Sequence, residues 1–108
     1  MTDNDKVPEL TNGEFESFVK KGVVLVDFFA EWCMPCVMMG PIVDDLSEEF
    51  EGKAKIGKVN IDDNSEIASK HNIQSIPTFV LFKDGKVVEQ ITGSKAQYEL
   101  SELVNKHL

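Results

Sequence analysis

The chain has 108 residues, of which 42% are hydrophobic, and its 11 Lys and Arg against 19 Asp and Glu give a formal net charge of −8 at pH 7. A chain of this length can bury an apolar core without metal or disulfide staples, so we expect a single domain over residues 1–108. The acidic balance argues against nucleic-acid binding, which needs clustered positive charge, and against electrostatic attachment to anionic membranes.

The start of the sequence has no visible targeting segment, because residues 1–6 are polar and acidic whereas a secretory signal begins basic and becomes apolar. The longest apolar run, Val23 to Ala30, contains Asp27 and is far shorter than the ~20 residues that span a bilayer. We therefore expect a cytoplasmic protein. In that reducing compartment a lone cysteine pair is more typical of catalysis or metal binding than of a structural staple.

The first predicted element is a helix that follows a lead-in segment. Residues 1–8 are expected to be flexible or to contribute to an edge strand, which Pro8 would weaken. Thr11 and Glu14 have the spacing of a capping box, so the helix should begin there and end near Gly22.

A buried strand and a long helix come next. Val23 to Phe29 is apolar at nearly every position, as in strands that are covered on both faces. From Pro35 the apolar residues recur at helical spacing, with Pro41 expected to kink the helix and Gly52 to end it.

The second half of the chain alternates strands and helices. The expected elements are a strand over Lys53 to Ile61, a short helix to about His71, strands over Thr78 to Lys83 and Lys86 to Ile91, and a terminal helix that Ser94 and Gln97 would cap. Asp84-Gly85 between the last two strands is a hairpin turn signal. The element order predicts an α/β fold, with a mixed sheet of four to five strands and helices on both faces.

The chemistry of the chain centres on Trp32-Cys33-Met34-Pro35-Cys36, which contains its only cysteines. Cys33 follows a buried strand and opens a helix, where unpaired N–H groups and the helix dipole favour a thiolate. Cys36 lies one turn further, where it can attack a mixed disulfide formed by Cys33. Pro35 suits the first turn because its missing N–H is no loss there.

Two other interpretations of the cysteine pair are weak. A structural zinc site usually has four ligands, and only His71 and His107 could join the two thiols, neither at a paired spacing. Covalent haem attachment needs a histidine directly after the second cysteine, where Val37 stands. We expect no metal and no cofactor besides a redox-active Cys33–Cys36 disulfide.

Trp32 and the nearby methionines allow two interpretations. The flat Trp32 side chain beside the nucleophile could form a contact surface for protein substrates, or it could simply fill the core. For Met34, Met38 and Met39 core packing is the default, although Met34 lies inside the motif and is expected to be exposed.

Asp27 and Lys58 form a candidate buried pair. Desolvation should raise the pKa of a carboxyl group in an apolar strand, so Asp27 could accept a proton from Cys36 or could be a hydrogen-bonded structural residue. Lys58 falls on the face of its strand that could meet Asp27, with extension to solvent as the alternative.

Since only ~5–6% of X–Pro bonds are cis, the base rate predicts a trans bond before Pro77.

Taken in order, these stretches resemble the thioredoxin family over essentially the whole chain after the first several residues. The matching stretches are Val26-Asp27-Phe28, Ala30 to Cys36, Pro41, Lys58-Val59-Asn60-Ile61-Asp62, Ile76-Pro77-Thr78-Phe79, Phe82-Lys83-Asp84-Gly85 and Gly93. The resemblance implies a thioredoxin fold and protein-disulfide reductase activity. It also implies a nucleophilic Cys33, a resolving Cys36, and a buried acid/base at Asp27 with Lys58 beside it.

For the substrate surface, the resemblance implies that Pro77 is cis and lies against the dithiol. The backbone of Ser75 and Ile76 would then pair with a bound substrate strand, and Gly93 would let that strand approach closely. Trp32, Met34 and Pro35 are expected on the same surface.

Three residues depart from the family pattern: Met34 stands where glycine is usual, Phe29 replaces a common tryptophan, and Val37 replaces a frequent basic residue. Residues between the cysteines tune the dithiol, so Met34 bears on its redox potential.

We predict a monomeric protein-disulfide reductase that acts on disulfide-containing proteins and is recycled by a thioredoxin-reductase-type enzyme. The alternatives are a disulfide oxidant or isomerase with the same fold, and a non-catalytic subunit that docks through the same surface.

Overall fold

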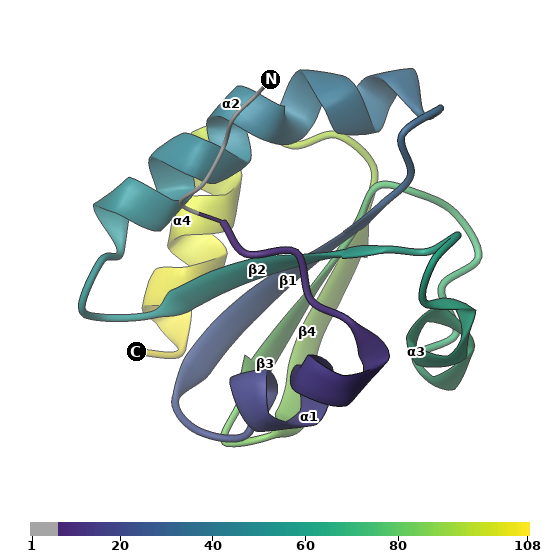
Figure 1. The fold of residues 1–108 in the computed structure, drawn as a ribbon. Helices are drawn as coiled ribbons and strands as arrows, with labels where there is room; N and C mark the ends of the chain where they lie inside the picture. The colour runs from purple at the N-terminus through teal and green to yellow at the C-terminus, as the bar shows by residue number, and fades with distance from the viewer. Residues whose placement is uncertain (1–6) are drawn as a thin grey trace.

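A mixed β-sheet of four strands forms the centre of the computed structural model, which describes residues 7–108 (Figure 1). Its strands are β1 (Val23–Phe29), β2 (Lys55–Asn60), β3 (Thr78–Lys83) and β4 (Lys86–Thr92), in the order β2-β1-β3-β4. β1 is parallel to β2 and antiparallel to β3, which is antiparallel to β4. The predicted mixed α/β architecture is confirmed.

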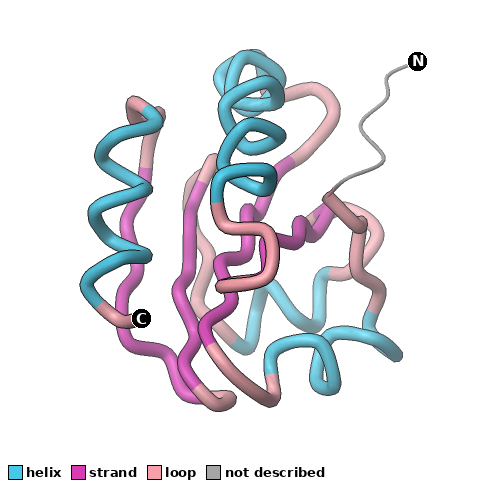
Figure 2. The backbone as a smooth tube through the Cα atoms, turned by 90° about the vertical axis from the view of Figure 1, so that its left-hand side faces the viewer, coloured by secondary structure: helices cyan, strands magenta, loops and turns pink. Residues whose placement is uncertain are grey.

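Helices cover both faces of this sheet (Figures 1 and 2). They are α1 (Asn12–Val19), α2 (Met34–Glu49), α3 (Ser65–Lys70) and α4 (Gln97–Lys106). α2 and α4 lie on one face, and α1 and α3 on the other. β1 alternates between the two cores and is buried from Val23 to Phe28, which explains its almost continuous apolar sequence.

The hairpin between β3 and β4 matches its turn signal. Asp84 and Gly85 have φ values of 52° and 86°, the left-handed conformation that a tight hairpin requires. Asp84 also exchanges hydrogen bonds with Gly22, whose N–H donates to Asp84 Oδ1 at 2.8 Å. This contact ties the α1–β1 connection to the hairpin at the end of the sheet that lies away from the cysteines.

The expected start of the last helix needs correction. α4 begins at Gln97 rather than at a Ser94 cap, because the Glu99 carboxylate accepts the Ala96 N–H at 2.8 Å. The expected N-terminal edge strand, as far as the described residues reach, is a single bridge between Glu9 and Lys58. Residues 1–6 of that expected segment lie outside the described part of the chain.

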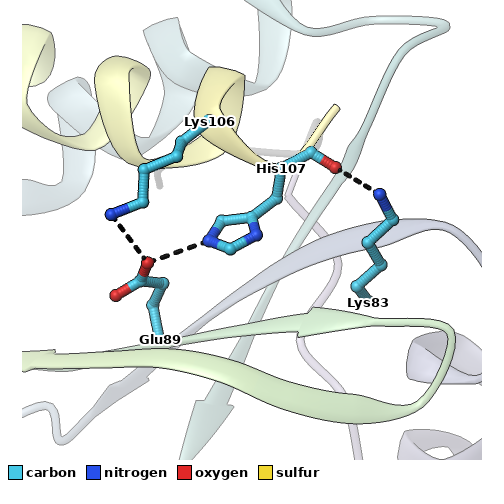
Figure 3. A network of polar contacts seen from close by, with 4 residues as sticks. All are labelled: Lys83, Glu89, Lys106 and His107. Carbon is cyan, nitrogen blue, oxygen red and sulfur yellow. Dashed lines mark hydrogen bonds and ion pairs between the residues drawn. The ribbon is translucent and has the colours of Figure 1, made fainter.

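Polar contacts hold the end of α4 against the β3–β4 hairpin (Figure 3). Glu89 on β4 accepts Lys106 Nζ at 3.1 Å and pairs with His107 Nε2 at 2.8 Å. These hydrogen bonds, that of His107 first, lower the pKa of Glu89. Lys83 Nζ donates to the His107 carbonyl at 2.9 Å. Surface contacts of this kind add little stability.

Candidate active site

The two cysteines form a disulfide at the N-terminus of α2. Cys33 is the N-cap residue of the helix, and its Sγ accepts the Cys36 N–H at 3.2 Å. Their Cα atoms lie 5.3 Å apart, and only 5% of Cys33 and 6% of Cys36 is exposed. A helix N-terminus favours negative charge, so opening this disulfide places a Cys33 thiolate where backbone N–H groups stabilise it.

Apolar residues from three other segments surround the disulfide. Ala30 is buried in the same cluster, while Phe29, Ile61 and Ile76 pack against it. The Ile76–Pro77 peptide is cis, as the family resemblance implied and contrary to the base rate for such bonds. The loop before β3 therefore reaches the cysteines through Ile76.

Hydrogen bonds fix this loop beside the end of β4. Thr78 Oγ1 donates to the Ser75 carbonyl at 2.6 Å, and the Pro77 carbonyl accepts the Gly93 N–H at 2.8 Å. Gly93 has a φ of 99°, a conformation that favours glycine, and the space where a side chain would start is open. Ser75, Ile76, Pro77 and Gly93 thus lie together on the cysteine side of the molecule.

Four exposed apolar side chains border the disulfide, and we call them the apolar rim: Trp32, Met34, Val37 and Met38. Trp32 is 70% exposed, which excludes the core-filling alternative, and its indole N–H donates to Asp62 Oδ2 at 2.9 Å. The default of core packing is wrong for Met38, which is 67% exposed; of the methionines in residues 7–108, only Met39 is buried. Pro35, in the first turn, is also exposed.

Asp27 lies in β1 directly opposite Lys58 in β2. The Asp27 side chain is buried, and its Oδ1 has no hydrogen-bond partner among residues 7–108. Burial raises the pKa of Asp27 from its ordinary value of 3.8 to about 7, against the opposing effect of the Lys58 charge. Lys58 is half-buried, with Nζ 5.5 Å from the centre of the Phe29 ring. The two side chains lie on one face of the sheet, as predicted.

A cleft of about 560 Å³ joins this buried carboxyl group to the disulfide. Asp27, Lys58 and Cys36 all line it, together with the exposed carboxylate of Glu31. Because the cleft has room for water, a proton could pass between Asp27 and Cys36 without direct contact. Sequence reasoning assigned no role to Glu31, which adjoins the motif.

Neither histidine is placed to join the cysteines in a zinc site. His71 lies against the rings of Phe15 and Phe82 on the α1/α3 face, and His107 pairs with Glu89 at the end of α4. Within residues 7–108 no group of three or more His, Cys, Asp or Glu could hold a metal ion. No helix in that range is long and apolar enough to cross a membrane.

Sequence reasoning also missed two surface features. Asp62 belongs to a stretch that matched the family, yet its bond to Trp32 joins residues 30 apart in sequence. The exposure of Met38 is the second feature, since Met39 beside it in sequence is buried. Met38 lies four residues after the exposed Met34, and this spacing places both on the same side of the helix, a signal that could have predicted its exposure.

Comparison with known proteins gives one consistent result. The thioredoxin family model matches residues 6–106. Thioredoxins of Staphylococcus aureus strains Mu50 and MW2 are each 42% identical over 102 residues, covering 94% of this chain and 98% of theirs. The solved structure of a mutant thioredoxin from Halobacterium salinarum NRC-1 matches with a TM-score of 0.86 at 33% identity, covering 99% of this chain and 96% of that one.

These matches extend over nearly the whole chain and agree with the cysteine pair at the start of α2. Thioredoxins need no cofactor beyond this disulfide, and they act on disulfide substrates and are recycled by a reductase. The chain is therefore a thiol–disulfide oxidoreductase and belongs to the thioredoxin family of protein-disulfide reductases.

Proposed function

We propose that Cys33 is the attacking thiolate of this reductase and Cys36 the resolving one. The observation that carries this assignment is the position of Cys33 as N-cap of α2, with its Sγ accepting the Cys36 N–H. The Cys33 thiolate attacks a substrate disulfide, forming a mixed disulfide and releasing one substrate thiolate. The Cys36 thiolate then attacks Cys33 Sγ, which forms the internal disulfide and releases the second. Two electrons pass to the substrate.

Asp27 is proposed to take the proton that Cys36 must lose before it attacks. A carboxyl group with a pKa of about 7 can accept and return a proton near neutral pH, and the shared cleft offers a path through water. Lys58 is proposed to moderate the basicity of Asp27, since its positive charge opposes the rise in the pKa of that carboxyl group.

The substrate is proposed to bind as an extended strand across the surface next to Cys33. The backbone of Ser75, Ile76 and Pro77 would pair with it, and the open space at Gly93 would admit its backbone. The exposed side chains of Trp32, Met34 and Pro35 would contact the residues that flank its disulfide.

We further propose that the protein works as a monomer in the cytoplasm, with a thioredoxin-reductase-type enzyme as its electron source. A reducing compartment keeps the dithiol open, as the proposed direction requires. A monomer leaves the apolar rim free for both substrate and reductase.

Replacement of single cysteines tests these roles. Cys33→Ser should reduce insulin disulfides no faster than the uncatalysed reaction. The matched variant Cys36→Ser should still attack but stop at a mixed disulfide, which non-reducing gel electrophoresis detects. Insulin reduction by Cys33→Ser at the parent rate would exclude the mechanism.

The reduction potential tests the direction of transfer. A value near that of thioredoxin, about −270 mV, supports a reductase, whereas one near about −120 mV indicates an oxidant.

A further inference from the structure

In the oxidised protein, the accessible sulfur atoms are not those of the cysteines. The disulfide leaves no thiolate, and both cysteines are buried. Of the three methionines within residues 7–108, Met39 is 2% exposed, while Met34 and Met38 are 65% and 67% exposed. Of the sulfur atoms within this described range, an oxidant in solution therefore reaches the two exposed thioethers first.

These two thioethers lie at the edge of the disulfide. Met34 follows Cys33 directly, and Met38 comes four residues later, so both project from the same side of the first turns of α2. With Trp32 and Val37 they make up the apolar rim. Methionine is flexible and polarisable, which suits a surface that must fit many different partners.

We propose that Met34 and Met38 are an oxidation site whose modification lowers the affinity of the apolar rim for protein substrates. The oxidant is a hydroperoxide. The thioether sulfur donates an electron pair to one peroxide oxygen, the O–O bond breaks, a sulfoxide forms, and water or an alcohol leaves. The sulfur is oxidised by two electrons and the peroxide is reduced by two.

The consequence for turnover rests on the proposed function. A sulfoxide is polar, so a protein substrate that covers the rim would bury its oxygen without a matching donor, which is unfavourable. We expect the rate of insulin reduction to fall roughly three- to thirtyfold after oxidation. A small aromatic disulfide does not cover the rim, and its reduction should keep its rate.

The first measurement maps the oxidation. The disulfide form is treated with hydrogen peroxide, and peptide mass spectrometry follows oxygen addition at each methionine. Met34 and Met38 should be converted well before Met39, which is the buried control in the same helix. Equal rates at all three methionines would overturn the proposed site.

The second measurement links oxidation to docking. Treated protein is freed of peroxide, reduced with dithiothreitol, and assayed with insulin and with the small disulfide. The double variant Met34→Leu/Met38→Leu keeps an apolar, helix-compatible rim without thioethers. Each protein is compared with its own untreated sample, so the starting activity of the variant does not enter the result.

The proposal requires that peroxide slow insulin reduction in the parent and not in the double variant. An equal loss in both proteins, or an equal loss with both substrates, would place the damage elsewhere and reject the docking role. Failure of the proposed function gives a different result, since Cys33→Ser would then reduce insulin at the parent rate.

Discussion

Each face of the sheet holds a titratable side chain in very different surroundings, Asp27 being buried and His71 half-buried. On the α2/α4 face, Asp27 lines a cleft with Lys58 and Cys36. On the α1/α3 face, the ring of His71 lies against phenylalanine rings, at centroid distances of 5.4 Å from both Phe15 and Phe82.

Burial acts on both groups in the same sense, because it favours the neutral form. It raises the pKa of Asp27 and lowers the pKa of His71. The Lys70 charge lowers the pKa of His71 further, and the Glu16 charge raises it. A shifted pKa alone thus does not identify a functional group here. The difference is that Asp27 shares a cleft with Cys36 of the disulfide, whereas the His71 ring lies against phenylalanine rings on the other face.

The largest expected effect is a loss of stability when the phenylalanine cluster around His71 is disrupted. Phe82→Ala removes a fully buried ring and should lower the free energy of unfolding by about 3–5 kcal/mol. Leu81→Ala, at the next position of β3, makes the matched cavity on the opposite face and should cost about 2–5 kcal/mol. Urea unfolding measures both.

Phe82→Ala should also return the pKa of His71 toward 6.5, because a contacting ring is lost. Titration of the His71 ring by NMR tests this. An unchanged pKa in the variant would mean that the phenylalanine cluster is not what desolvates His71.

Asp27→Asn sharpens the other side. The raised pKa of Asp27 means that its contribution to stability is full below pH 3.8 and is lost as the pH rises through about 7. Because the variant lacks this group, its free energy of unfolding should rise relative to that of the parent from pH 4 to pH 8, by on the order of a few kcal/mol at pH 8. Glu31→Gln, which removes an exposed carboxylate of the same cleft, is the matched control for the loss of one acidic side chain.

Parallel pH profiles of the urea midpoint for Asp27→Asn and the parent would contradict the buried-charge account.

The same variant tests the proposed proton transfer. Release of substrate from the mixed disulfide should slow more than the initial attack, measured by stopped-flow fluorescence of Trp32. Equal slowing of both steps argues against the acid/base role.

The smallest effect concerns His71. Its lowered pKa makes a contribution to stability that is present above pH 6.5 and lost as the pH falls through the folded value. In an Asp27→Asn background, which removes the opposing slope, His71→Leu should reduce the loss of stability between pH 7 and pH 5. Identical losses with and without His71 would show that its ring adapts to the charge.

Much of the fold could be predicted because local patterns agree with tertiary packing. Val23 to Phe28 is apolar since both faces of β1 are covered, and Asp84-Gly85 provides the left-handed turn that its hairpin needs. The start of α4 differs from the expected one because two capping signals overlap, and Glu99 accepts the Ala96 N–H where Ser94 and Gln97 were expected to form the cap.

The site was predicted less completely, because its geometry depends on contacts between distant segments. The disulfide position follows from a short motif, but the Trp32–Asp62 bond and the aromatic contacts of His71 need the folded sheet. The roles of Cys33, Asp27 and the loop at Pro77, like the single-domain organisation, stay predictions until the variants are measured.

The two edges of the sheet differ in how far other backbone covers them. The outer edge of β2 is partly covered, because Lys58 exchanges backbone hydrogen bonds with Pro8 and Leu10 at 3.0 Å and 2.7 Å. β4 stands at the other end of the order, and no strand within residues 7–108 pairs with its outer side. A free edge presents backbone donors and acceptors to other chains. Strand-to-strand association of native molecules at high concentration should therefore proceed along β4 rather than β2.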